Sequence, residues 1–530
     1  MKPLNPAGRL GLAVVVALVA AALAQAAPQA LVNLKLSGEM PPFADIMFTE
    51  FHISPDSRYT VYMADAEVDE HYDQFSVPAD GSDRPVKLNF PLDKEGGAYF
   101  RAFTPDSGHV LYTAHTTFYG PLELYIVPVN GGDSIKLNGP FVEGGNIDDF
   151  VISPDGRWLV YRANQDTKDK FEIYRVPIEG GEAVKLNEPL SPASSVAHYA
   201  ISSDGSRVVY EADQRQELYF GLYSVPSSGG AATELSEPDL NLWSMRVVPG
   251  GDRVVFSARR GDSLPIELYS VPIEGGENTK LSLPMSAEAY IWEFALTPDG
   301  ERVVYSVYDS AIRLHDLYSV SPAGGAVALL NNWLGRKLGI VEFAISPDGS
   351  RVIFEATLDE ERAINLYSVP MDGGVVTRLN DPLAPNERIG AFAISPDSRR
   401  VVFEQGKGRD GDDAAVIYSA PIAGGDPVRL SEPGDVYQMV ISPDSAYVFY
   451  DTCRLLDGDC AVRRAPMQGG TPIQINGPLV AGGIVAGFLV APDGRRVVYL
   501  ADQEINNKYE LFVTIDTIAP RAYVPVVVNQ

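Results

Sequence analysis

Cysteine, histidine and tryptophan are all scarce in this chain. Its 530 residues include 2 Cys, 6 His and 4 Trp. The histidines are scattered, and none belongs to an H-E-x-x-H motif or to the Cys/His spacing of a zinc site. A G-x-S-x-G elbow, which marks a large class of hydrolases, is also missing. The sequence therefore predicts no catalytic residue and no metal site, and it favours a protein that is not an enzyme.

Long apolar runs are almost absent, and the one that exists lies at the N-terminus. Residues 10–24 are apolar, follow Lys2 and Arg9, and end in the small-x-small triplet 24–26. These features are typical of a secretory signal, here residues 1–26. A membrane anchor is the alternative, but the run is shorter than the roughly 20 residues that cross a bilayer. We expect a secreted or periplasmic protein with no membrane span after cleavage.

Positive charge is also in short supply. The chain has 42 Lys and Arg against 70 Asp and Glu, a formal net charge of −28. This balance disfavours nucleic acid and anionic membranes as partners, and it favours a basic protein or peptide. The Asp-rich loops 409–413 and 457–459 do not fit the calcium-loop pattern. We therefore predict no cofactor, with a divalent cation as the weaker alternative.

The two cysteines lie close together in the sequence. Cys453 and Cys460 flank the loop RLLDGD. In an exported chain, such a pair predicts a disulfide that staples the loop, whereas a metal-binding or catalytic pair would need further ligands nearby.

A repeat fills most of the chain, and residues 343–379 show it most clearly. They contain the apolar runs FAIS, RVIFEA, NLYSVP and VVTRL. Each run alternates large apolar with small or polar residues, which is the periodicity of a strand. The turns 346–349 (SPDG) and 370–374 (PMDGG) carry the Pro, Asp and Gly that fold one strand back on the next. The unit is therefore a four-stranded antiparallel meander.

Ten such units follow one another, with their first turns 46 to 50 residues apart. This period matches the blades of a β-propeller. Ten blades exceed the usual four to eight, so two smaller rings are the alternative. No linker interrupts the spacing, which favours one ring. The turns are marked by Pro55, Pro105, Pro154, Ser203, Pro249, Pro298, Pro347, Pro396, Pro443 and Pro492.

Both ends of the repeat region (27–515) bear on how a ring would close. The tenth unit lacks a clear fourth strand, and LVNLKL at 31–36 resembles one without the three strands that should precede it. Pairing these two ends would remove the exposed edges of an open stack. Residues 516–530 form either a tail or a rival closing strand, since AYVPVVV at 522–528 is apolar and β-prone.

Three stretches resemble the TolB-like, WD-repeat-like propeller repeat: ISPDGRWLVYRA (152–163), ISPDGSRVIFEA (345–356) and APDGRRVVYLAD (491–502). The resemblance covers residues 31–515 and implies a propeller. TolB itself is a periplasmic protein of the Tol-Pal envelope system, with a separate domain before a six-bladed propeller. This chain has no such domain and more repeats, so the resemblance does not carry the Tol-Pal role.

Candidate binding residues lie at the start of the strand that should be nearest the ring centre. The residue five before the turn proline is charged or ionisable in five units, and the residue before it is aromatic in others. We predict an acidic, aromatic-rimmed mouth that binds a basic protein or peptide. The alternative is that the aromatics wedge between blades and the carboxylates only face solvent. The predicted residues are Glu50, Asp149, His198, Trp243, Trp292, Glu293, Glu342 and Tyr437.

Three functions remain open. A non-catalytic, exported binding scaffold is favoured by the uniform repeats and the acidic charge. The second is a propeller-type polysaccharide lyase or glycosidase, which would use channel carboxylates or His such as Glu50, Asp149, Glu293, Glu342 and His198. A surface adhesion protein is the third, supported only by the tripeptide at 260–262 (RGD).

Overall fold

The computed structural model describes residues 31–517 except 94–95, 118–119, 262–264, 313, 332–338, 358–362, 384–386, 408–414, 435 and 455–458. All regular secondary structure in this part of the chain is β-strand. The predicted all-β propeller fold is confirmed. The signal segment 1–26 and the rival strand 522–528 lie outside the described residues.

The described strands form ten antiparallel groups of four, which we call blades. Blades 5 and 6 are joined into one eight-stranded sheet by a single parallel pair, Ile266 with Tyr290. Blades 1 to 5 are β2 (Ile46–Ile53), β3 (Tyr59–Val68), β4 (His71–Pro78), β5 (Val86–Lys87); β6 (Gly97–Phe103), β7 (His109–His115), β8 (Glu123–Pro128), β9 (Ile135–Lys136); β10 (Ile147–Ile152), β11 (Trp158–Ala163), β12 (Glu172–Pro177), β13 (Val184–Lys185); β14 (Val196–Ile201), β15 (Arg207–Gln216), β16 (Tyr219–Pro226), β17 (Thr233–Glu234); and β18 (Leu240–Val247), β19 (Arg253–Arg260), β20 (Ile266–Pro272), β21 (Thr279–Lys280).

Blades 6 to 10 continue the same order, and blade 10 takes its fourth strand from the start of the described chain. They are β22 (Ala289–Leu296), β23 (Val303–Asp309), β24 (Leu314–Val320), β25 (Ala328–Leu329); β26 (Ile340–Ile345), β27 (Arg351–Thr357), β28 (Ile364–Pro370), β29 (Thr377–Arg378); β30 (Glu387–Ile394), β31 (Arg400–Lys407), β32 (Val416–Pro421), β33 (Val428–Arg429); β34 (Met439–Ile441), β35 (Tyr447–Arg454), β36 (Asp459–Pro466), β37 (Ile473–Gln474); and β38 (Val485–Val490), β39 (Arg496–Ala501), β40 (Glu510–Asp516), β1 (Leu31–Lys35).

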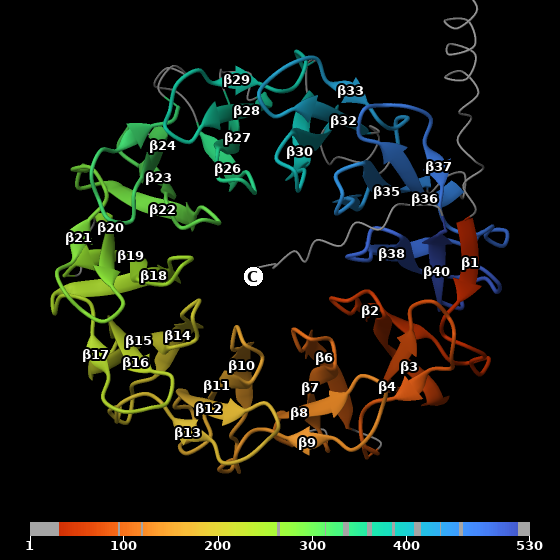
Figure 1. Cartoon of the computed structure of the whole chain (residues 1–530), viewed down its shortest axis with the longest axis horizontal. Coiled ribbons are helices and arrows are strands. Elements are labelled where there is room, and N and C mark those ends of the chain that lie inside the picture. Colours follow the sequence, from red (N-terminus) through yellow and green to blue (C-terminus); the bar gives the residue numbers. More distant parts are fainter. Residues whose placement is uncertain are drawn as a thin grey trace, which may run out of the picture.

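The blades follow one another around a ring (Figure 1). The first strand of a blade, such as β10, β22 or β26, lies nearest the centre, and the two-residue last strand, such as β13, lies at the periphery. This is the radial order that the sequence predicts for its candidate binding residues, which sit on first strands.

Apolar side chains of neighbouring blades pack against each other and hold the ring together. Phe343 and Phe354 of blade 7, for example, share a buried cluster with Val304 and Leu317 of blade 6. Large side chains recur at the position of Phe343 in most blades, as expected for a stripe that packs between sheets. One face of each blade therefore packs against the blade before it.

The first turn of most blades is stabilised by its own side chains. In blade 7, Ser346 Oγ donates to Asp348 Oδ1 (2.7 Å), and the N–H groups of Ser350 and Arg351 donate to Asp348 Oδ1 and Ser346 Oγ (3.0 Å each). The residue after the Asp has positive φ, which Gly349 adopts without strain (φ 70°). These local bonds explain why the turn motif repeats.

Serine replaces this glycine in four turns and connects neighbouring blades. Ser57 keeps the positive φ (63°). In each of these turns, the serine Oγ accepts the N–H of the turn aspartate of the preceding blade. The pairs are Asp56 with Ser107 (3.1 Å), Asp348 with Ser398 (2.9 Å), Asp397 with Ser445 (3.0 Å) and Asp493 with Ser57 (2.9 Å).

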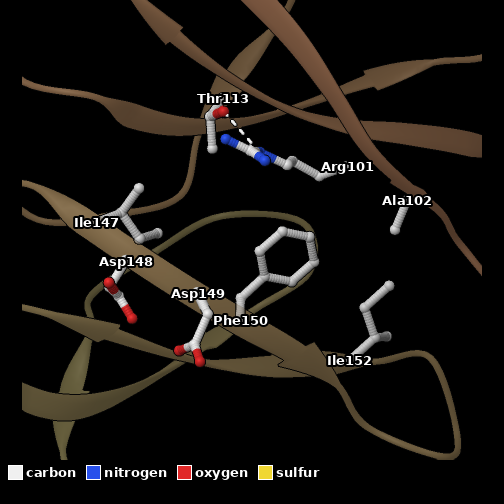
Figure 2. A pocket seen from close by; sticks show the side chains of 8 residues that line it. All are labelled: Arg101, Ala102, Thr113, Ile147, Asp148, Asp149, Phe150 and Ile152. Atoms are coloured by element: carbon white, nitrogen blue, oxygen red, sulfur yellow. Dashed lines mark hydrogen bonds between the residues drawn. The ribbon is translucent and has the colours of Figure 1, made fainter. Parts of the chain in front are cut away.

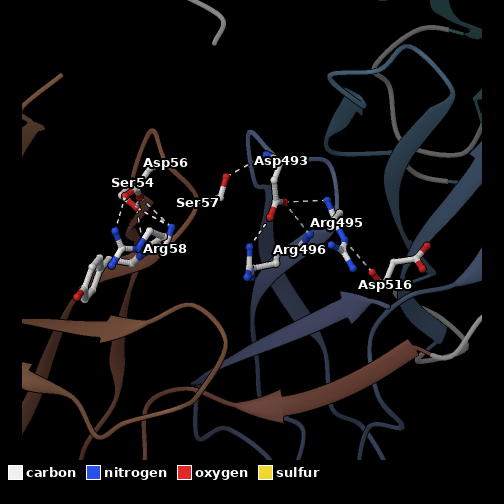
Figure 3. Close-up of polar contacts among 9 residues, drawn as sticks. Ser54, Asp56, Ser57, Arg58, Asp493, Arg495, Arg496 and Asp516 are labelled. Atoms are coloured by element: carbon white, nitrogen blue, oxygen red, sulfur yellow. Dashed lines mark hydrogen bonds and ion pairs between the residues drawn. The ribbon is translucent and has the colours of Figure 1, made fainter. Parts of the chain in front are cut away.

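The last of these pairs joins blade 10 to blade 1, so this seam carries the same contact as three boundaries inside the chain (Figure 3). At the outer edge of blade 10, β1 pairs with β40 from Leu31–Asp516 to Lys35–Phe512, and Lys35 Nζ lies 2.8 Å from Glu510 Oε1. These pairings favour LVNLKL as the closing strand. A single closed ring of ten blades stays a prediction, which we test below.

Candidate functional site

A β-bulge interrupts the innermost strand at the same point in six blades. In β22, Ile291 pairs with Val307 and Glu293 with Ser306, so Trp292 between them has no partner across the ladder. A bulge re-aims the side chain of its extra residue. Trp292 is accordingly 60% exposed. The other residues skipped in this way are Asp148, Ala197, Trp243, Val341 and Ala486.

The predicted aromatic residues are exposed: Trp243 and Trp292 lie on innermost strands, and Tyr437 lies just before one. Trp243 and Tyr437 are 64% and 63% exposed, similar to Trp292. Side chains with this exposure are not wedged between blades, so that alternative does not hold for these three. One of them, Trp292, directly precedes a predicted carboxylate, Glu293, whereas Ser244 follows Trp243 and Gln438 follows Tyr437.

The predicted charged residues fall into separate groups. Glu293 and Glu342, on β22 and β26, interact electrostatically, and so do Asp149 and His198, on β10 and β14. Glu50 is half-buried on β2, and the described contacts connect it to neither group. The mouth is therefore not uniform around the ring.

The structure adds a second ring of polar residues that sequence reasoning missed. They lie on the second strand of each blade, opposite the predicted positions: Arg162 pairs with Asp149, Glu211 with His198, and Glu355 with Glu342. A signal was available, because the eighth residue after each turn Pro (Ser203 in blade 4) is charged in five otherwise apolar strands. These residues are Arg162, Glu211, Glu355, Glu404 and Asp451.

The mixed-charge arc, as we name it, comprises Asp148, Asp149, Arg162, His198 and Glu211 of blades 3 and 4. Arg162 forms an ion pair with Asp148 and donates from Nη1 to the carbonyls of Val196 (3.1 Å) and Ala197 (2.6 Å). It thereby satisfies two carbonyls of the next blade as well as a carboxylate. Burial raises the pKa of Asp149, and the nearby Arg162 partly offsets this.

His198 is the ionisable base of this arc. Its Nδ1 lies 3.2 Å from Oε2 of the buried Glu211. The hydrogen bond to Glu211 raises the pKa of His198, against the opposing effect of burial. Charges in the mixed-charge arc are therefore paired.

A cavity of about 460 Å³ adjoins this arc, between blades 2 and 3 (Figure 2). Its polar lining includes Arg101, whose Nε donates to Thr113 Oγ1 (2.8 Å), together with Asp148 and Asp149. Ala102, Ile147, Phe150 and Ile152 supply the apolar lining. The cavity thus combines a cation, carboxylates and an apolar surface.

The acidic arc, as we name it, comprises Glu293, Glu342, Glu355, Glu404 and Asp451 of blades 6 to 9. Burial and the neighbouring Glu342 raise the pKa of Glu355 to about 7, and Arg388 only partly opposes this. Burial and Glu342 likewise raise the pKa of Glu293, partly offset by Arg246. Burial and the nearby Asp451 also raise the pKa of Glu404. Like charges crowd together here.

Asp451 differs from the rest of the acidic arc because it has a structural role. Its Oδ1 accepts the backbone N–H groups of Tyr437 (3.0 Å) and Gln438 (2.7 Å), which holds the innermost strand of blade 9 in place. Burial nevertheless raises its pKa.

An aromatic cluster borders the acidic arc. The ring of Trp292 packs edge-on against Tyr308 and His315, with centroids 6.4 and 6.0 Å apart, and tilts toward Tyr290. These contacts hold one face of the indole while most of the side chain stays exposed.

The two cysteines lie directly opposite each other, Cys453 on β35 and Cys460 on β36. This placement is compatible with a disulfide, but the bond stays a prediction.

Within the described ranges, no three His, Cys, Asp or Glu side chains are placed to hold a metal ion. No helix in that part of the chain is long and apolar enough to span a membrane.

Comparison with known proteins adds support for the fold. No protein-family model matches the sequence, and no curated protein matches it either. Among solved structures, a eukaryotic initiation factor is similar at 13% identity and a TM-score of 0.50, over 77% of this chain and 94% of that one.

Two further structures are more distant. An oligogalacturonate lyase in complex with manganese shares 16% identity over 64% of this chain and 94% of its own, with a TM-score of 0.34. A putative TolB from Agrobacterium tumefaciens shares 17% identity over 47% of this chain and 87% of its own, with a TM-score of 0.27. At these identities and TM-scores, neither similarity supports a conclusion about the function of this chain.

Proposed function

We propose that the chain is an exported, TolB-like, non-catalytic scaffold that binds a basic protein or peptide at the acidic arc. The observation that carries this proposal is the crowding of Glu293, Glu342 and Glu355 in the neighbouring blades 6 and 7, where Arg246 and Arg388, the cations that act on them among the described residues, only partly oppose their repulsion. Like charges at this spacing repel, and a bound cation relieves the repulsion. The scaffold requires no cofactor for this role.

Exposed aromatics beside the carboxylates support the same function. Trp243 and Trp292 present large, rigid surfaces on the innermost strands of blades 5 and 6, and Tyr437 does so just before the innermost strand of blade 9. Interfaces draw most of their binding energy from a few such anchors, and complementary charge sets orientation and rate. The net charge of −28 would steer a basic partner towards the molecule.

The direct test uses a fluorescent hexa-arginine peptide and its citrulline counterpart, which has the same shape without the charge. Wild-type protein should bind only the arginine peptide. Reversal of Glu293 and Glu342 to Lys should weaken binding at least about tenfold, which corresponds to 1.4 kcal/mol. Reversal of Glu274 and Glu301, two exposed turn residues, makes the same change in net charge and should have little effect. Equal losses in both variants would show only a general charge effect.

A second candidate function rests on the mixed-charge arc. His198 with Glu211, and Arg162 with Asp149, lie beside a cavity that also contains Arg101. A polysaccharide lyase or glycosidase would use such a carboxylate/His set for proton transfer. The test is an assay on acidic polysaccharides with wild type and His198→Ala. Product formed by wild type and lost in the variant would favour this function over the scaffold.

A further inference from the structure

Glu355 is a buried residue whose carboxylate has no partner among the described residues. This residue is only 6% exposed. In the described part of the chain, no hydrogen bond or ion pair reaches it, and Arg388 acts on it only through the electrostatic field. Burying an ionised carboxylate without such a partner is costly, so residues of this kind are almost always paired.

The nearest neighbour of Glu355 makes its position less favourable still. Glu342 lies directly opposite on β26 and is exposed. Directly opposed residues have Cβ atoms roughly 4.5 to 5.5 Å apart, and like charges in this arrangement destabilise a sheet. The next carboxylate, Glu293 on β22, also interacts with Glu342. The three carboxylates thus run from an exposed position to a buried one.

In blade 3, the residue at the position equivalent to Glu355 is charged and has partners. There Arg162 occupies the place of Glu355 and faces Asp149, which occupies the place of Glu342. The guanidinium of Arg162 forms an ion pair with a carboxylate and donates hydrogen bonds to two backbone carbonyls. Blade 7 has a carboxylate at this position instead, and among the described residues no cation of that blade pairs with it.

The geometry points to a site for one guanidinium group between Glu342 and Glu355, an anchor for an arginine side chain of the basic partner. This inference rests on the proposed function and specifies how that function is achieved. A guanidinium suits the site better than an ammonium because its planar fork bonds two acceptors at once.

The experiment compares Glu355→Gln with Glu274→Gln, an exposed control, in binding of hexa-arginine and hexa-lysine. Glu355→Gln should weaken hexa-arginine binding by about tenfold or more. Hexa-lysine should bind wild type more weakly and respond less to the substitution. Glu274→Gln should match wild type. Because Glu355→Gln removes an unpaired charge, it should fold, and circular dichroism verifies this.

Proton release gives a second, independent measurement. At pH 7 the Glu355 carboxyl is about half protonated, so a bound cation should expel about half a proton. Calorimetry of hexa-arginine binding in two buffers of different ionisation enthalpy measures this number. Release should occur in wild type and disappear in Glu355→Gln.

The outcomes separate this inference from the proposed function. If wild type binds hexa-arginine, and Glu355→Gln binds as tightly and with the same proton release, the anchor site is refuted while the scaffold function stands. Equal affinity for hexa-lysine refutes guanidinium selectivity. If wild type binds neither peptide, the proposed function itself fails.

Discussion

Arg162 and Glu355 occupy equivalent places in two blades, yet their surroundings are opposite. Arg162 faces an aspartate and satisfies two carbonyls of the next blade, whereas Glu355 faces a second glutamate. The apolar positions around both follow the same repeat. The propeller framework therefore tolerates either charge at this position, and selection on stability alone would favour the paired arrangement. Among the described residues, Glu355 of blade 7 has no such partner, and this is the position where we propose that a cation binds.

The comparison makes its strongest prediction for Arg162. Replacement by Met should lower the free energy of unfolding by about 2 to 3 kcal/mol, because it leaves buried acceptors and nearby carboxylates without a donor. Thermal unfolding measured by circular dichroism tests this. Arg157→Met is the matched control, since the Arg157 side chain is 84% exposed, and it should change stability by less than about 0.5 kcal/mol. Similar losses in both variants would mean that Arg162 acts only through bulk.

The opposite result is expected for Glu355. Its pKa is raised from 4.5 to about 7, so the folded state holds this proton more tightly than the unfolded state. Stability should therefore fall as pH rises from about 4.5 through 7. Glu355→Gln should be more stable than wild type by about 1 to 2 kcal/mol at pH 8, after allowance for solvent screening, and equal to it near pH 4. Melting temperatures at both pH values test this, and an unchanged difference would point to packing.

Closure of the ring can be tested by comparing the seam with an internal boundary. Ser57→Ala and Ser398→Ala each remove one hydrogen bond between neighbouring blades without changing backbone strain. Each should cost about 1 kcal/mol. An effect of Ser398→Ala with none for Ser57→Ala would contradict a closed ring. Electron-microscopy class averages of the purified protein would count the blades directly.

The smallest effect is expected at His198. The hydrogen bond that His198 donates to Glu211 raises the pKa of His198, so the stabilisation is complete below pH 6.5 and is lost as pH rises through the raised folded-state pKa. Because the side chain is 70% exposed, the contribution should stay under about 0.5 kcal/mol. An NMR titration of the imidazole tests it, with His198→Gln for assignment. Glu211→Gln should lower the pKa, and an unchanged value would exclude this pair.

Sequence reasoning identified the strands and turns well because their causes are local. The SPDG turn forms through bonds among Ser346, Asp348 and their neighbours, so four residues suffice to predict it. The alternation in RVIFEA predicts a strand in the same way. The likeness of residues 31–36 to a fourth strand also pointed to the partner that β40 has in the structure.

The site was harder to predict because its causes are not local. The bulge that exposes Trp292 arises from pairing with β23, which the sequence of β22 does not reveal. Glu355 was overlooked because RVIFEA reads as a buried strand, and its charge matters only opposite Glu342. Aligning the ten repeats and comparing the residues at each equivalent position, rather than reading each strand by itself, would have found Glu355.

The pairing of β1 with β40 has a consequence for the order of assembly. β1 is the first strand of the described chain to be made, but its partner β40 is the last. Contacts this distant in sequence form slowly, since a long loop must close before they form. Until then, the growing protein carries open strand edges that can pair with other chains. Final registration of these two strands should therefore limit the rate of maturation, and this intermediate is the species that a holdase chaperone would protect.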